Sequence, residues 1–317
     1  MKAIVQHEDK LVVEEVAAPE ISSGEVLVKV HAAGVNRADL LQSKGHYPVP
    51  AGASPILGLE CAGVIEDPGD TGRSRGERVA CLLTGGGYAE YVAVPEGQLL
   101  PIPEGFSFIE AASIVEVACT VWSNIGMLAG LEKGDTFLVH GGAGGIGTFA
   151  IQMGKSLGAT VAVTAGSAEK LETCRQLGAD ILINYRKEDF AEVLRNRADV
   201  ILDIIGAKYL PQNVKALAPD GHMVTIGLQG GVKGELNLGL LLAKRGTISA
   251  TALRGRDVAD KARIVASTVD NIWPLLENSQ IRTQIDRTLP LRDAGGALRA
   301  LEEGTVTGKI VLEVLGE

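Results

Sequence analysis

The sequence has few cysteines, and the four it contains lie far apart. Cys61, Cys81, Cys119 and Cys174 form no CxxC pair. This spacing is typical of reduced thiols and does not fit the disulfide framework of a small secreted domain. We therefore expect a cytoplasmic protein in which Cys61 and Cys174 are packed side chains.

Long apolar runs and excess positive charge are also missing. No apolar run approaches the roughly 20 residues of a membrane span, and the first ten residues, MKAIVQHEDK, lack a signal-peptide core. The formal net charge is −9, which argues against nucleic acid and membranes as partners. The 317 residues, 46% of them hydrophobic, predict two globular domains with a sizeable core.

Glycine, in contrast, is abundant at 40 residues, and one glycine-rich turn organises the chain. An apolar strand at 137–139 leads into HGGAGGIG, which contains the spacing G-x-G-x-x-G, and a helical pattern follows. Glycine lets the backbone approach a phosphate, and the helix N-terminus offers N–H groups and partial positive charge. The turn therefore predicts a dinucleotide site formed by Gly142, Gly144, Gly145, Ile146 and Gly147.

Strands and helices alternate after this turn. Alternation at this spacing indicates βαβ crossovers, and hence a doubly wound parallel sheet of the Rossmann type. The strand candidates are 160–164, 180–184, 200–205, 223–227 and 247–253, with helices between them such as 168–177 and 209–218.

The two ends of the chain predict a second domain. Residues 1–119 read as short strands separated by turn residues, which indicates a mostly antiparallel β domain. In 256–317, helical spacing runs from Asp257 to Leu276 and stops near Trp273-Pro274. A strand at 285–289, a helix at 293–303 closed by Gly304 and a last strand at 308–314 follow. We predict that 256–317 return to complete the domain of 1–119, and that 120–255 bind the nucleotide.

Several motifs carry a resemblance to a known family. VNRADLLQSKGHYP, LGLECAGVI, GGGYAEYV, HGGAGGIG and GKIV resemble, in this order, the medium-chain dehydrogenase/reductase superfamily. Nearly the full chain is similar to its zinc-free NADPH:quinone oxidoreductase (zeta-crystallin-like) branch, and most closely to the small stress-inducible quinone oxidoreductases. The resemblance implies a GroES-like β domain beside the Rossmann domain. It also implies that Asn36 and Thr120 lie close to the nicotinamide.

The chain departs from the zinc alcohol dehydrogenases of that superfamily at their metal ligands. Those enzymes place Cys where Val35 or Asn36 stands and His where Leu59 stands. Since a catalytic zinc needs about three N, S or O side-chain ligands, we expect no metal here.

The residues after the second strand of the Rossmann segment indicate the cofactor. An NAD site usually has Asp or Glu about 20 residues past the glycine turn, but here the strand runs into Ala165-Gly166-Ser167 without an acid. Lys170 follows, and Tyr185 and Arg186 lie after the third strand, so donors and positive charge face a 2′-phosphate. In the resembling family the matching Ser, Lys and Tyr hold that phosphate and the adenine. We predict NADPH.

The nicotinamide end is expected where later strands finish. Gly227, Leu228 and Leu253 end the last two strands, and ligands bind outside the carboxyl ends of such sheets. Lys309, at the start of the final strand, either reaches the cofactor or is an exposed lysine. Asp203 either fixes a loop or takes part in function.

Two residues of the first domain are candidates for catalysis. Asn36 and Tyr47 could hydrogen-bond a developing oxyanion, and Tyr47 could also supply a proton. Alternatively, Asn36 caps the helix that begins near Arg37, and Tyr47 packs beside prolines. Glu60 is expected to buttress its loop rather than transfer a proton. Acceptor specificity is expected in the loops around Tyr47, 85–87 and 253–257.

The leading hypothesis is an NADPH-dependent reductase of quinones or related conjugated carbonyls, since a quinone accepts hydride without an obvious catalytic dyad. An enoyl-thioester reductase is the alternative enzyme. A third possibility is an NADPH-binding structural or regulatory protein with little turnover. The uncharged strand 246–253 should lie at the sheet edge, where pairing with a second copy would form a homodimer, as the resemblance also implies.

Overall fold

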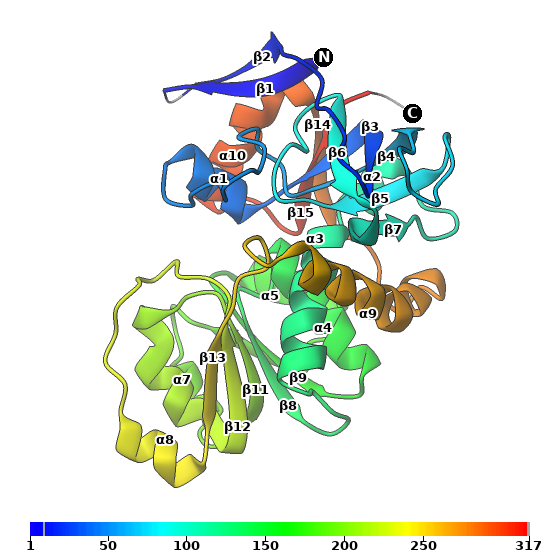
Figure 1. Cartoon of the computed structure of the whole chain (residues 1–317). Coiled ribbons are helices and arrows are strands. Elements are labelled where there is room, and N and C mark those ends of the chain that lie inside the picture. Colours follow the sequence, from blue (N-terminus) through cyan, green and yellow to red (C-terminus); the bar gives the residue numbers. More distant parts are fainter. Residues whose placement is uncertain (9, 316–317) are drawn as a thin grey trace. The chain divides into compact units, whose positions relative to one another are not determined.

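A computed structural model describes residues 1–8 and 10–315 (Figure 1). It divides the chain into two compact units. The first contains Met1–Cys119, Leu253–Glu277 and the chain from Thr283 onward, and the second contains Thr120–Ala252 and Asn278–Arg282. One boundary between the units therefore falls between Ala252 and Leu253. The sequence analysis predicts this boundary three residues later, between 255 and 256.

The second unit is built on a parallel sheet. Its strands are β8 (Thr136–His140), β9 (Thr160–Ala165), β10 (Ile181–Asn184), β11 (Ala198–Asp203), β12 (Leu217–Thr225) and β13 (Thr247–Ala250). They lie in the order β10-β9-β8-β11-β12-β13, and every pair is parallel. The carboxyl ends of all six strands therefore meet at one edge of the sheet, and the predicted Rossmann fold is confirmed.

Helices cover both faces of this sheet (Figure 1). They are α4 (Gly145–Ser156), α5 (Ala168–Gln176), α6 (Phe190–Val193), α7 (Leu210–Ala216) and α8 (Leu238–Lys244), with short segments η2 (Trp122–Leu128) and η3 (Ala207–Tyr209). One face packs Leu138 and Ile201 against Phe190 of α6 and Ala216 of α7. On the other face, Gly154 of α4 lies against Phe137. Successive strand residues point to opposite faces, so a sheet covered on both sides is apolar throughout.

The first unit contains a larger, mostly antiparallel sheet. The strands of this unit are β1 (Lys2–His7), β2 (Lys10–Glu15), β3 (Glu25–Val35), β4 (Glu60–Asp67), β5 (Arg78–Leu82), β6 (Tyr91–Pro95), β7 (Leu99–Pro101), β14 (Ile285–Pro290) and β15 (Lys309–Glu313). β1 and β2 form a separate hairpin, and the others follow the order β14-β15-β3-β4-β5-β7 with β6 also on β3. β15 pairs with β3, so the C-terminal strand completes the N-terminal sheet.

The helical segments of this region border the sheet core. They are α1 (Arg37–Ser43), η1 (Glu96–Gln98), α2 (Phe108–Ala112), α3 (Val115–Val121), α9 (Val258–Glu277), η4 (Leu291–Asp293) and α10 (Ala294–Glu303). The core joins Val28 and Val30 of β3 to Leu40 of α1 and Leu298 of α10. Gly304 ends α10 with φ 67°, as its sequence position predicts.

Several sequence-based boundaries differ from the structure. The helical spacing of 257–276 matches α9 to within one residue, so only its expected stop near Pro274 is wrong, and the strand expected at 223–227 is β12 at Leu217–Thr225. Helix α9 continues through Pro274 to Glu277, because Trp273 and Leu276 are buried and the Trp273 indole donates to the Pro101 carbonyl at 2.7 Å. These contacts offset the hydrogen bond that proline removes. Strand β13 ends at Ala250 rather than Leu253, since its partner β12 ends at Thr225, directly opposite Ala250.

One helical stretch bears on the expectation that no apolar run reaches membrane-span length. Within the described residues, the helical stretch Phe108–Leu128 is long and apolar enough to qualify. However, 72% of its window is buried inside the structure, and core helices of soluble proteins pass the same test.

Candidate functional site

The glycine turn places backbone where side chains would not fit. A Cβ on Gly147 would lie 2.4 Å from the carbonyl oxygen of Gly141, and one on Gly142 would lie 2.9 Å from the Val163 Cβ. Gly141 itself takes φ 70°, a conformation that favours glycine. Gly144 differs, because a Cβ there would meet only the Gly141 oxygen at 3.6 Å. The tight turn therefore leaves space over Gly144 at the start of α4, where an anionic group can approach N–H donors.

Polar side chains from the loop after β10 lie against Gly166, which follows β9. β9 and β10 pair in parallel with Ala165 opposite Asn184, so the residues that follow each strand come together. A Cβ on Gly166 would lie 2.5 Å from the Tyr185 hydroxyl and 3.4 Å from Arg186 Nε.

Ser167 and Lys170 begin the neighbouring helix α5. The Ser167 hydroxyl accepts from the Lys170 backbone N–H at 3.3 Å, which leaves its own proton for another acceptor. Ser167, Lys170, Tyr185 and Arg186 thus come from two adjacent strand ends, which makes one end of this edge rich in donors.

The next strand ends carry less polar chemistry. The Asp203 carboxylate accepts from the backbone N–H groups of Ile205 at 2.8 Å and Gly206 at 3.0 Å, and from the Thr225 hydroxyl at 3.2 Å. Burial raises the pKa of Asp203. These contacts support the loop-fixing interpretation of Asp203. Gly227 follows β12, and a Cβ there would lie 2.9 Å from the Ile204 carbonyl oxygen, while the adjacent Leu228 is half exposed.

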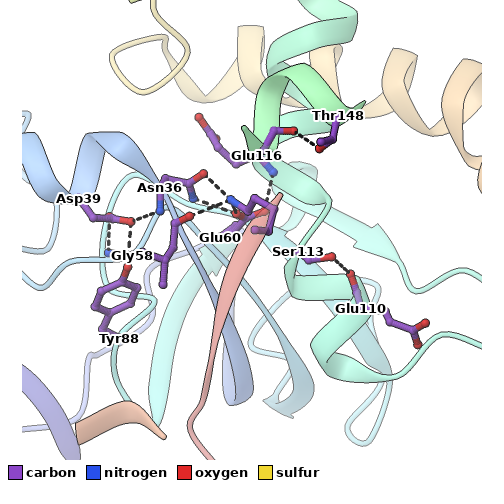
Figure 2. Close-up of polar contacts among 12 residues, drawn as sticks. Asn36, Asp39, Gly58, Glu60, Tyr88, Glu110, Ser113, Glu116 and Thr148 are labelled. Carbon is purple, nitrogen blue, oxygen red and sulfur yellow. Dashed lines mark hydrogen bonds and ion pairs between the residues drawn. The ribbon is translucent and has the colours of Figure 1, made fainter. Parts of the chain in front are cut away.

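Asn36, Glu60 and Lys309 form a polar cluster in the first unit, and Figure 2 shows Asn36 beside Glu60. The Lys309 ammonium donates to Glu60 Oε1 at 2.7 Å, to Asn36 Oδ1 at 2.6 Å and to the Val35 carbonyl at 3.0 Å. Asn36 Nδ2 donates to Glu60 Oε1 at 2.8 Å, and the Glu116 backbone N–H donates to Glu60 Oε2 at 2.8 Å. Glu60 is 0% exposed and Lys309 5%.

The contacts of this cluster bear on three expectations from sequence. The Glu60 carboxylate accepts from Asn36, Lys309 and the Glu116 backbone N–H rather than from its own loop, so its role as a loop buttress stays a prediction. Lys309 is not an exposed lysine, because its side chain is buried and its ammonium donates to three protein acceptors. Asn36 precedes α1 as its N-cap residue while its side chain joins the cluster.

A second buried group lies next to this cluster and was missed from sequence. The Asp39 carboxylate accepts from the Asn36 backbone N–H at 2.8 Å, the Gly58 N–H at 3.0 Å and the Tyr88 hydroxyl at 2.9 Å (Figure 2). Burial raises the pKa of Asp39 to about 6, against the lowering effect of these donors. The position of Asp39, three residues after Asn36, is the local signal for this capping contact. Tyr88 has no such local signal.

Tyr47 lies beside Arg254. The Arg254 guanidinium carbon is 5.2 Å from the centre of the Tyr47 ring, and Arg254 Nε donates to the Thr84 carbonyl at 2.8 Å. The Lys261 ammonium donates to the Thr84 hydroxyl. Burial raises the pKa of Tyr47 above its ordinary value. Its hydroxyl can donate a hydrogen bond. Arg254 and Lys261 were not predicted as site residues.

Two further predicted residues are buried. Thr120 is buried, and its carbonyl accepts from Asn124 Nδ2 at 2.8 Å. Leu253 is buried at the start of the segment that contains Arg254. Over residues 1–8 and 10–315, no group of three or more His, Cys, Asp or Glu side chains could hold a metal ion.

Comparison with known proteins now identifies the family. A profile described as "Alcohol dehydrogenase GroES-like domain" matches residues 22–104, and one described as "Zinc-binding dehydrogenase" matches 145–267. The quinone oxidoreductase of Pseudomonas aeruginosa is 32% identical over 297 residues, covering 91% of this chain and 90% of that protein. The chain belongs to the medium-chain dehydrogenase/reductase superfamily, in its quinone oxidoreductase branch.

Other members of the superfamily match over nearly the whole chain. A phenolphthiocerol/phthiocerol polyketide synthase protein of Mycobacterium tuberculosis is 30% identical over 96% of this chain, but the chain spans only 14% of that protein's length. The quinone oxidoreductase of Escherichia coli, solved with NADPH, superposes with a TM-score of 0.87 at 26% identity over 99% of both chains. An NAD-dependent alcohol dehydrogenase superposes with a TM-score of 0.86 at 30% identity, covering 99% of this chain and 100% of its own.

Proposed function

We propose that this oxidoreductase uses NADPH to reduce quinones or related conjugated carbonyl compounds, without zinc. The observation that carries the proposal is the donor group around Gly166. Tyr185 and Arg186 lie against Gly166 where β9 and β10 end, and Ser167 and Lys170 begin the helix α5 that follows β9. β9 runs into Gly166 and Ser167 without the carboxylate typical of NAD sites. The E. coli relative solved with NADPH supports this choice.

The residues of the glycine turn fit the pyrophosphate of such a cofactor. The space over Gly144 lets an anion reach the N-terminus of α4, and Gly142 and Gly147 keep the turn tight enough to form it. Bound NADPH would supply the hydride, while the protein positions it and excludes water. We assign Gly145, Ile146, Gly227, Leu228, Leu253 and Thr120 to the same cofactor site.

Zinc independence rests on the residues at three loop positions. Val35 and Leu59 have no metal-binding atoms, and Asn36 already uses both its amide oxygen and nitrogen in the Lys309–Glu60 cluster. A catalytic zinc site needs about three protein ligands. An enzyme that keeps its activity after dialysis against a chelator would agree with this proposal, whereas activity restored only by zinc would contradict it.

Asn36 and Tyr47 remain our candidates for contact with the reacting groups, and their surroundings suggest different roles. Asn36 is held by Lys309 and Glu60, so it can line the site in a fixed orientation. Tyr47 keeps a phenolic proton that can be donated to a developing oxyanion on the acceptor. We propose that Lys309 acts through Asn36 rather than on the cofactor directly.

Kinetics of a Lys170→Ala variant test the cofactor assignment. The change removes a charged donor to the 2′-phosphate, so KM for NADPH should rise about 5- to 30-fold, the equivalent of 1–2 kcal/mol, while KM for NADH barely changes. Lys133→Ala is the matched control, because Lys133 is exposed and precedes β8 at the opposite, amino end of the sheet. Equal or better use of NADH by the native enzyme would contradict the proposal.

An enoyl-thioester reductase is the second candidate, and the match to a polyketide synthase segment favours it. NADPH oxidation with 1,2-naphthoquinone and with crotonyl-CoA separates the two. We expect turnover of the quinone, and a preference for crotonyl-CoA would select the second candidate. Tight NADPH binding without oxidation across a broad set of acceptors would instead indicate a structural or regulatory protein.

We also propose a cytoplasmic homodimer formed through β13. β13 is the last strand of the sheet and pairs only with β12 among the described strands, and Val232, Leu238 and Leu242 in the preceding segment are 74%, 68% and 79% exposed. Exposed apolar side chains beside an open edge strand favour association. Sedimentation should give a dimer at micromolar concentration, and Leu242→Glu should weaken it. The four cysteines are all buried and unpaired, which fits the cytoplasm.

A further inference from the structure

Arg254 carries buried donors that the fold does not satisfy. Its side chain is 4% exposed, and Nε donates to the Thr84 carbonyl at 2.8 Å. The terminal nitrogens Nη1 and Nη2 are both buried and have no hydrogen-bond partner in the described part of the chain. Between them they hold four N–H donors on a charged group, and leaving such donors unmet is costly. Buried donors are normally hydrogen-bonded, so these nitrogens are expected to bind an acceptor other than the described residues, such as a ligand.

The surroundings of Arg254 are built to hold it in place. Thr84 binds two cations. Its carbonyl accepts a hydrogen bond from Arg254, and its hydroxyl accepts one from the Lys261 ammonium. Lys261 is also buried, at 2% exposed. The Tyr47 ring lies 5.2 Å from the Arg254 guanidinium carbon. All four residues belong to the first unit, yet they come from three separate stretches of sequence. Anchoring through Nε, with an aromatic ring alongside, presents the two terminal nitrogens as a rigid fork.

The chemistry of this fork indicates the ligand. A planar guanidinium offers two parallel N–H bonds, which match the two oxygens of a carboxylate, and a second cation nearby favours an anion. Burial lowers the pKa of Arg254, and the negative charges of Asp39 and Glu116 raise it. These two carboxylates therefore contribute negative charge near the guanidinium. This nearby negative charge disfavours a phosphate dianion, so a singly charged, flat anion fits best.

We propose that Arg254 recognises a carboxylate on the electron acceptor, so that the preferred acceptors are quinones or enones bearing a carboxylate group. The inference rests on the proposed function, which places the acceptor beside Tyr47. Tyr47 contacts the apolar part of such an acceptor, and Lys261 adds positive charge behind the fork. Arg254 then determines which acceptors are chosen.

Acceptor selectivity tests this assignment. NADPH oxidation is measured with 1,4-naphthoquinone-2-carboxylate and with its neutral methyl ester, and the ratio of their kcat/KM values is compared between the native enzyme and Arg254→Met. We expect the ratio to fall at least about tenfold, because only the carboxylate loses its charged partner. The different reduction potentials of the two acceptors cancel when the ratios are compared. Arg254→Lys, which keeps the charge but not the fork, should lose part of the preference.

Arg263→Met is the matched control. It removes the same charge from the exposed side of α9, where Arg263 pairs with Asp260 at 2.5 Å and is 63% exposed. The acceptor ratio of this variant should equal that of the native enzyme. Equal losses with both acceptors in Arg254→Met would show that Arg254 only supports the fold. A raised KM for NADPH with an unchanged ratio would assign it to the cofactor. Either result overturns the proposal.

A binding measurement on the native protein covers the case in which Arg254→Met does not fold. Redox-inert 2-naphthoate should bind at least about tenfold more tightly than neutral 2-naphthamide in calorimetric titrations, and equal binding of the two would refute the carboxylate site. This measurement also separates the two proposals. Preferred binding of 2-naphthoate by an enzyme that reduces neither quinone would retain the carboxylate site and reject quinone reduction.

Discussion

The Lys309 ammonium offers a sharp test of what holds the first unit together. Replacing Lys309 with Met keeps much of the side-chain length but removes the charge and the bonds to Glu60, Asn36 and Val35. Glu60, which is 0% exposed, then keeps its negative charge without a counter-ion. We expect a large loss of stability in the first unit.

The size of the loss follows from the contacts that remain. Removing one partner of a buried ion pair costs about 3–5 kcal/mol. Glu60 still accepts from Asn36 Nδ2 and from the Glu116 backbone N–H, each at 2.8 Å, and these donors continue to stabilise its charge. We therefore expect a value at the low end, about 3 kcal/mol, which is a large part of the 5–15 kcal/mol typical of a folded protein.

Tryptophan fluorescence can follow the first unit separately. The chain has two tryptophans. Trp273 is buried in the first unit, where its indole donates to the Pro101 carbonyl, and Trp122 belongs to the second. In a Trp122→Phe background, urea unfolding monitored at Trp273 reports the first unit. The shift of the urea midpoint at unchanged slope measures the change in unfolding free energy.

Two further variants decide whether the reasoning holds. Lys44→Met breaks an ion pair with Glu302 in which both side chains are 40% or more exposed, so it should cost less than about 1 kcal/mol. Adding Glu60→Gln to Lys309→Met removes the uncompensated charge and should return about 1–3 kcal/mol. Equal losses for Lys309→Met and Lys44→Met, or a double variant whose loss is the sum of the single losses, would refute the buried-pair account.

Two other predictions concern the second unit. Burial lowers the pKa of His140 from 6.5 to about 4, so as the pH falls the unfolded chain binds a proton at this histidine before the folded chain does. The resulting contribution to the unfolding free energy, about 3 kcal/mol, is present above pH 6.5 and lost as the pH falls towards 4. The unfolding free energy of His140→Gln should therefore depend less on pH between 6.5 and 4, and an unchanged pH dependence would contradict this. Gly147→Ala places a Cβ 2.4 Å from the Gly141 oxygen and should lower the urea midpoint of unfolding. Gly144→Ala places its Cβ 3.6 Å from the same oxygen, so it should keep the midpoint and weaken NADPH binding in titrations. Equal midpoints for the two variants would rule out the steric reasoning.

Features that depend on neighbours in sequence could be predicted without the structure. The strand, turn and helix from β8 to α4 follow from an apolar run, a glycine pattern and a 3.6-residue period. The parallel sheet follows from the alternation of strands and helices, and the position of β13 at its edge is confirmed. The donors around Gly166 could also be anticipated, because parallel neighbours bring the residues after β9 and β10 together.

Errors arose where tertiary contacts override a local rule. Pro274 should end a helix, yet α9 continues because Trp273 and Leu276 are buried beyond it. The stretch Phe108–Leu128 is apolar enough to pass the length-and-composition test for a membrane span, although it contains Glu110 and Glu116, because most of its window lies in the interior. In both cases burial outweighs the local preference.

The sequence by itself determined the family, the two-unit architecture and a glycine turn suited to a dinucleotide, since each is written in patterns of adjacent residues. Tertiary structure alone decided what surrounds the individual polar groups. It brings Lys309 to Asn36 and Glu60, and sets Arg254 beside Tyr47 with two terminal nitrogens that the described chain leaves unmet. These partners lie far apart in the sequence, and whether a buried charge finds a counter-charge, a carbonyl or a ligand depends on which strands and loops converge. For that reason the sequence left the role of Lys309 open, and the structure shows it in a buried ion pair with Glu60. Arg254 is in no motif of the sequence analysis, and its unmet donors make it the candidate for acceptor recognition.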